Sequence, residues 1–188
     1  GVFLIFGLLH SLNFFYIFTQ MAFPLSIVGY ILGVGLTEEF PKMIPLFILQ
    51  HRSKEPMLPQ TMVYYGLMAG IAFGVFEGVQ YQTTINIHAD YTTAFLLNIA
   101  RLTSLPFLHA TWCGIAGHFI GMAGLYPRYR KGLWFLALVI PAVLHGLYDS
   151  FAGNFYVVSL CVAVFTVLLL MAYMRRSGKL RERLRENG

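Results

Sequence analysis

The chain has 188 residues, of which 57% are hydrophobic and only 11% are charged, and its mean hydropathy is +0.67. A soluble domain carries about 25% charged residues, so this composition excludes an ordinary soluble protein and indicates an integral membrane protein. The formal charge of +5 does not predict a nucleic-acid partner, because most basic residues lie at the ends of apolar segments, as membrane topology requires. The expected environment is therefore a lipid bilayer.

Six apolar segments follow one another at 2–20, 25–49, 61–81, 106–126, 133–152 and 155–174. A helix that crosses a bilayer needs roughly 20 apolar residues, so we predict an all-α polytopic protein with about six transmembrane helices. Residues 1–174 form one membrane domain in this prediction, and 175–188 form a basic helical tail in water. The longest connection is 82–105, in which 92–105 is predicted to be an interfacial or partly inserted helix, with a bend at Pro106. Gly1 lies in an apolar run without an initiator Met, so we expect a processed or trimmed N-terminus rather than a signal peptide.

The basic residues define an orientation. With six spans, one side of the membrane receives eleven of them: Arg52, Lys54, Arg128, Arg130, Lys131, Arg175, Arg176, Lys179, Arg181, Arg183 and Arg185. The other side receives Arg101 alone, which either extends to the interface or turns inward to pair with a carboxylate. The positive-inside rule then places both termini in the cytoplasm, and we expect a plasma membrane of bacterial type.

Small residues predict how the helices pack. Glycines recur every three or four residues in the third span, at Gly66, Gly70, Gly74 and Gly78, and in the fourth, at Gly114, Gly117, Gly121 and Gly124. Such stripes allow close approach of helix backbones in lipid, so we interpret them as packing surfaces and not as a phosphate-binding loop. Cys113 and Cys161 lie in apolar segments and are expected to be small buried residues without a disulfide.

Ionisable residues inside the second span are the first functional signal. Glu38, Glu39 and Lys42 lie near the middle of an apolar run, where each charge costs on the order of 2.5–3.5 kcal/mol. Lys42 shares a helix face with both acids, so a purely structural ion pair is one interpretation. Pro41 removes a backbone donor, which predicts a local distortion of the helix around Thr37.

Four more polar residues in other spans are predicted to lie at one common depth, nearer the outer side than Glu38 and Glu39. Glu77, His109, His145 and Asp149 fall roughly 5–12 Å from the outer ends of their helices, at 1.5 Å per residue. His145 and Asp149 are four residues apart on one face, whereas His118 points away from His109 and is left out. Two histidines and several carboxylates fit a bound zinc or similar divalent ion, with a Glu as general base on water. They fit a metal-free site equally well, and both routes lead to hydrolysis of an amide or ester.

These residues carry a family resemblance. Glu38-Glu39-Phe40-Pro41-Lys42 matches an EExxK motif, Phe73 to Glu77 an FxxxE motif and His145 to Asp149 an HxxxD motif, with His109 between the last two. The order resembles the PrsW family of intramembrane proteases, which is related to CAAX-processing and bacteriocin-immunity membrane proteases.

The resemblance implies a CAAX-protease-like core and cleavage of a membrane-anchored, anti-sigma-factor-like protein near the extracytoplasmic side. It implies catalytic roles for Glu38, Glu39 and His145, and it is compatible with a metal held by Glu77, His109, His145 and Asp149. Glu77 and Asp149 stand where CAAX-type relatives usually have His and Asn, which argues against prenylated-protein processing.

Two other functions remain open at this point. The run 107–112 is similar to a helix of the scaffold subunit of gamma-secretase, although that subunit lacks the paired glutamates. Intramembrane acids also build the relays of proton and ion transporters.

Overall fold

The computed structural model describes residues 14–153 and 155–186, and every regular element in that part of the chain is a helix. After the short helices η1 (Ile17–Gln20) and α2 (Leu25–Val28), a π-helix, η2 (Gly29–Gly35), continues into α3 (Leu36–Arg52). The long helices α4 (Pro59–Thr84), α5 (Tyr91–Leu125), α6 (Arg130–Ala152) and α7 (Tyr156–Glu186) follow, joined by the short turns η3 (Asn86–His88) and η4 (Pro127–Tyr129). The predicted all-α fold is confirmed.

Among the described residues, three segments are long and apolar enough to cross a membrane: Pro59–His88, Pro127–Ala152 and Tyr156–Glu186. The predicted spans after the first all fall on described helices, and 2–20 lies largely outside the described residues. Large apolar side chains such as Met68, Phe76 and Leu168 are 59–65% exposed, which suits contact with lipid. The chain is therefore an integral membrane protein.

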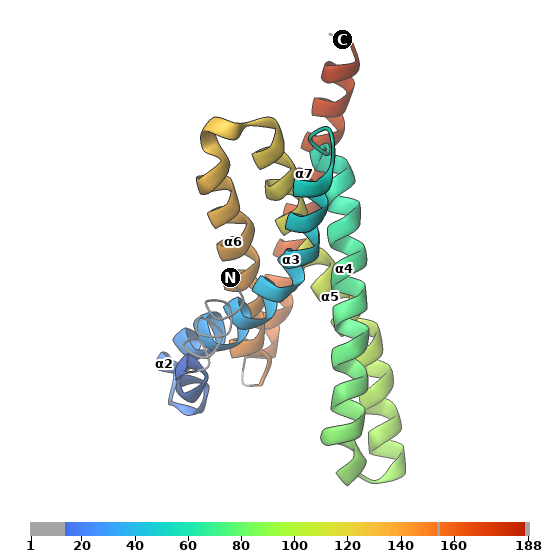
Figure 1. Ribbon diagram of the computed structural model, residues 1–188. Coiled ribbons are helices and arrows are strands. Elements are labelled where there is room, and N and C mark those ends of the chain that lie inside the picture. Colours follow the sequence, from blue (N-terminus) through green and yellow to red (C-terminus); the bar gives the residue numbers. More distant parts are fainter. Residues whose placement is uncertain (1–13, 154, 187–188) are drawn as a thin grey trace.

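The C-terminal half of α5 is the centre of the bundle. Nearly all of residues 108–123 are buried, and Trp112, Ile115 and Ile120 contact core residues from the surrounding helices, among them Met43 of α3 and Met62 of α4. Figure 1 shows α4 and α5 running side by side and extending together below the other helices. This arrangement places α3, α4 and α6 around one buried segment of α5.

The glycine stripes pack as predicted. A Cβ added at Gly66 or Gly70 would collide with the backbone of α5 at Cys113 or His109, and one at Gly117 with the backbone of Met62. Only glycine permits this close approach of the two backbones.

The structure corrects two local predictions. The segment 92–105 is not a separate helix but the first part of α5, which continues through Pro106; Gly74 of α4 lies against the backbone of Pro106. Cys161 is exposed on α7 rather than buried, since an apolar side chain on a membrane helix can face lipid; Cys113 is buried.

A distortion of the helix was predicted around Thr37, and a π-helix is present just before that residue. The π-helix η2 ends at Gly35, and the Thr37 hydroxyl donates to the carbonyls of Gly33 at 2.5 Å and Val34 at 2.9 Å. The side chain thus satisfies carbonyls at the junction of the two helix types, which is a common position for a functional site.

Candidate active site

The adjacent glutamates in the first turn of α3 have different surroundings. Glu39 is fully buried, and its Oε1 accepts hydrogen bonds from Lys42 Nζ at 2.7 Å and from His145 Nδ1 at 2.9 Å. The Glu38 side chain is 27% exposed, and its buried Oε2 has no hydrogen-bond partner and lies 3.8 Å from His145 Nε2. The Oε2 of Glu39 also lacks a hydrogen-bond partner, but Glu39 is enclosed and fixed through Oε1, whereas the partly exposed Glu38 is free to bind a ligand.

His109 is held in one tautomer by its partners. Lys42 Nζ lies 2.7 Å from its Nδ1, and Glu77 Oε2 lies 2.6 Å from its Nε2. A lysine ammonium has only donors, so Nδ1 accepts a hydrogen bond from it and Nε2–H donates to Glu77. The rings of Phe73 and Trp112 flank the imidazole edge-on, at centroid distances of 5.1 and 5.2 Å. Both ring nitrogens of His109 are thus occupied.

His145 instead presents one nitrogen to an electronegative site. Its Nδ1–H donates to Glu39, and its ring stacks on Trp112 at 4.1 Å with an interplanar angle of 13°. Its Nε2 faces Asp149 Oδ2 at 3.2 Å and Glu38 Oε2 at 3.8 Å. Two carboxylate oxygens and a ring nitrogen that converge in this way attract a proton or a cation.

The structure thus brings together all six residues that the sequence singled out, and Lys42 joins them. An isolated ion pair between Lys42 and the glutamates was one interpretation of the second span. In the structure the pair is not isolated, because Lys42 also contacts His109. His118 lies outside it and contacts Ser177 of α7.

Close backbone contacts hold the helices of the site in register. A Cβ at Gly35 would collide with the carbonyl of Ala142, and one at Gly146 with the backbone of Ile31, so η2 and α6 can approach only through these glycines. This approach brings Glu39 within hydrogen-bond distance of His145. The register of the network therefore depends on small residues outside it.

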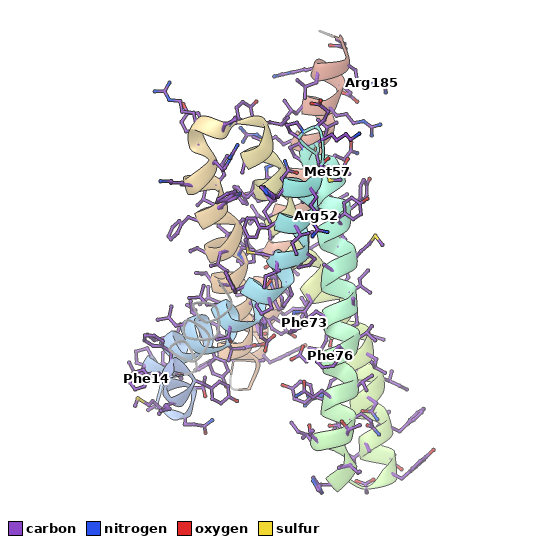
Figure 2. The ribbon with its side chains drawn as sticks, viewed as in Figure 1. Phe14, Arg52, Met57, Phe73, Phe76 and Arg185 are labelled. Carbon is purple, nitrogen blue, oxygen red and sulfur yellow. The ribbon has the colours of Figure 1, made fainter. Side chains whose placement is uncertain are left out.

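A cavity of about 270 Å³ opens beside the network and is lined by Glu38, Phe73, Phe76, Glu77, Gln80, Tyr81, Thr84 and Ile85. Figure 2 shows Phe73 and Phe76 projecting from α4 toward the side where α3 begins. Arg101 forms no ion pair with a carboxylate among the described residues. Its guanidinium instead lies 3.6 Å from the centre of the Tyr81 ring. The cavity gives Glu38 access to a ligand.

Sequence reasoning missed the contribution of Trp112, Gln80 and Tyr81. Trp112 follows His109 by three residues, so its position on the same face of α5 was a usable signal. Gln80 and Tyr81 follow Glu77 by one turn of α4 and line the same cavity. Nothing in their residue types distinguished them from ordinary interfacial side chains.

Three of these residues offer ligand atoms suited to a metal ion. One atom each from Glu38, His109 and His145 lies within 4.8 Å of the others. The unpartnered Glu38 Oε2 and the nearby Nε2 of His145 fit a divalent ion directly, whereas His109 would have to exchange its bond to Lys42 or Glu77. Three protein ligands and one open position are typical of catalytic zinc, so the donor set fits such an ion.

Fold and site together define a membrane-embedded protein with a hydrolase-type cluster of acids and histidines. The chain belongs to the PrsW family: the model of the PrsW family intramembrane metalloproteases matches residues 1–174. It is therefore an intramembrane protease, and family membership favours this function over the scaffold and transporter alternatives.

The chain is similar to curated proteins named Protease PrsW. It is 25% identical to that of Shouchella clausii over 155 residues, which cover 81% of this chain and 68% of the relative. It is 27% identical to that of Oceanobacillus iheyensis over 149 residues, with coverages of 79% and 66%. It is 26% identical to that of Halalkalibacterium halodurans over 116 residues, which cover 62% of this chain and 50% of the relative. The chain thus spans about half to two thirds of these relatives, and no solved structure matches it.

Proposed function

We propose that this protein hydrolyses a peptide bond of a membrane-anchored protein, with Glu38 as the general base for the attacking water. The observation that carries the proposal is the unpartnered Glu38 Oε2, which lies beside His145 Nε2 and at a cavity inside an apolar bundle. A buried carboxylate oxygen without a hydrogen bond is costly, and its use as a proton acceptor explains why it is kept.

The residues divide the chemistry among them. Glu38 takes a proton from water as the water oxygen attacks the carbonyl carbon, and it passes that proton to the departing amine when the C–N bond breaks. Protonated His145 donates from Nε2 to the oxyanion that forms. Glu39 orients His145 through Nδ1, and Lys42 holds both Glu39 and His109 in place. Glu77 fixes the tautomer of His109, and Asp149 stabilises the positive charge on His145.

A divalent ion, zinc or another, would take the place of the proton on His145 Nε2, and Glu38, His109 and a neutral His145 would hold it. It would supply a Lewis acid and lower the pKa of its water, and Glu38 would then serve as a ligand in place of the metal-free role given above. Elemental analysis of the purified protein tests this part. We expect about one equivalent of a divalent metal in the natural sequence and less than a tenth of that in the double variant Glu38→Gln, His145→Ala. If the protein retained full cleavage after exhaustive chelation, the metal site would be contradicted, while the role of Glu38 as general base would still stand.

The site lies away from the basic end of the molecule. Figure 1 shows the α3–α4 connection, the α5–α6 turn and the C-terminal end of α7 at the top, and these segments carry the eleven basic residues counted above. Glu77 is 18 residues beyond Pro59, the first residue of α4, or about 27 Å along the helix. With the basic end in the cytoplasm of a bacterial-type cell, cleavage takes place near the extracytoplasmic face, which suits an anti-sigma-factor-like substrate.

The test is cleavage of single-span, membrane-anchored peptides co-reconstituted with the protein in liposomes, with products identified by mass. Glu38→Gln should lower the rate by about 10²–10⁴-fold. Glu55→Gln, which removes an exposed carboxylate from the α3–α4 connection, is the matched control and should leave the rate unchanged. Cleavage that survives in Glu38→Gln would overturn the assignment of the base.

A further inference from the structure

A second cavity lies between α5 and α7 at the basic end, far along the bundle from the protease site. It has a volume of about 310 Å³ and is lined by His118, Met122 and Tyr126 of α5 and by residues of α7 that include Arg176, Lys179 and Leu180. Ligand pockets begin at roughly 300 Å³, so the space suits a compact polar group. None of these residues takes part in the proposed hydrolysis.

The inner wall of this cavity is polar although it is buried. His118 is only 3% exposed, its Nδ1 lies 2.8 Å from the Ser177 hydroxyl, and its ring stacks on Tyr173 at 4.6 Å. Ser177 is itself 1% exposed. These contacts fix the imidazole, so the cavity has a rigid, preformed wall.

The outer wall carries positive charge at a defined depth. Arg176, Lys179 and Arg183 all line the cavity, and their spacing of three and four residues places them on one face of α7. The apolar part of α7 ends at Met174, so Arg176 and Lys179 lie about 3 and 7.5 Å beyond it along the helix. The headgroup layer of a bilayer is roughly 5–8 Å thick on each side, which is the same depth.

We propose that this cavity binds the phosphate-bearing headgroup of an anionic phospholipid from the leaflet at the basic end. Arg176 and Lys179 supply charge-assisted hydrogen bonds to the phosphate, and His118 and Tyr126 line the space that the rest of the headgroup fills. The acyl chains lie along the apolar surface of α7, where side chains such as Leu168 and Met171 are exposed. Bound lipid ties the end of α7 to α5.

Native mass spectrometry and thermal unfolding of the purified full chain test the proposal. The probes are dioleoylphosphatidylglycerol, the zwitterionic dioleoylphosphatidylcholine, and glycerol 3-phosphate as a soluble source of the same phosphate chemistry. The first variant is Arg176→Gln with Lys179→Gln. Its matched control is Arg181→Gln with Arg185→Gln, which removes two charges from the opposite face of the same helix. A third variant, Leu180→Trp, fills the cavity without a change of charge.

Phosphatidylglycerol should bind at least about tenfold more tightly than phosphatidylcholine and should raise the unfolding temperature. The Arg176/Lys179 variant and Leu180→Trp should each lose most of this preference, while the Arg181/Arg185 control keeps it. Equal loss in the control would show that general surface charge attracts the lipid and would overturn the site. Binding of glycerol 3-phosphate as tight as that of the lipid would overturn the assignment to a lipid headgroup.

Discussion

Substitution of the two neighbouring glutamates should have opposite consequences. Glu39→Gln leaves the side-chain volume nearly unchanged but removes the negative charge that faces Lys42 at 2.7 Å and His145 at 2.9 Å, with Glu39 and Lys42 both buried. Loss of one partner from a buried ion pair costs about 3–5 kcal/mol, because the other charge is left uncompensated. For a chain of this length, that loss corresponds to a fall on the order of 10 °C in the unfolding temperature.

Glu38→Gln removes no hydrogen bond, because the buried Oε2 of Glu38 has no partner. We therefore expect its stability to stay within about 1 kcal/mol of the natural sequence, while cleavage is lost. Thermal unfolding in detergent, followed by tryptophan fluorescence, gives the first quantity, and cleavage of a reconstituted peptide gives the second. If the unfolding temperature of Glu38→Gln fell as far as that of Glu39→Gln, the distinction between Glu38 as a free base and Glu39 as a fixed positioning acid would be refuted.

Two further predictions concern the framework. Gly70→Ala places a Cβ against the carbonyl of His109, so it should lower stability by about 1–3 kcal/mol and reduce cleavage. In the control Gly132→Ala the added atom has no neighbour within 4 Å, and stability should change by less than about 1 kcal/mol. At the start of α5, hydrogen bonds from the Thr93 side chain and from the Thr93 amide, which donates to Asp90 Oδ1 at 3.1 Å, lower the pKa of the Asp90 carboxyl from 3.8. Because the folded pKa is depressed, this stabilisation is present above pH 3.8 and is lost as the pH falls through the lowered value. Hydrogen exchange at the Thr93 amide should accelerate there, and Asp90→Asn, which keeps a neutral capping group, should show no such step.

Patterns of single residue types carried much of the architecture. The apolar segments predicted the helices because a bilayer admits only backbones whose polar groups bond internally. Proline near the acids predicted a distorted helix around Thr37, and the π-helix lies just before it, at Gly29–Gly35. The expected separation of 92–105 from the fourth span is absent, since α5 is continuous through Pro106, and the close contact of its backbone with Gly74 of another helix is not encoded in local sequence.

The partners within the site could not be predicted in the same way. Spacing alone allowed Lys42 to pair with either glutamate, and the structure selects Glu39 because His145 and His109 approach from α6 and α5. The stacking of Trp112 on His145 depends on the same helix packing. Exposure distinguishes the two acids, and exposure is a property of the assembled bundle.

The sequence by itself determined that this protein resides in a membrane, that its helices approach through glycine, and that acids and histidines from distant segments occupy a similar depth. These features follow from the transfer free energy of each residue and from helix periodicity, which are local properties. Only the tertiary structure decided which carboxylate lies at the cavity, which imidazole nitrogen faces Glu38 and Asp149, and which basic residues line the second cavity. Those choices depend on how helices are rotated against one another, and rotation is fixed by contacts between residues far apart in the chain.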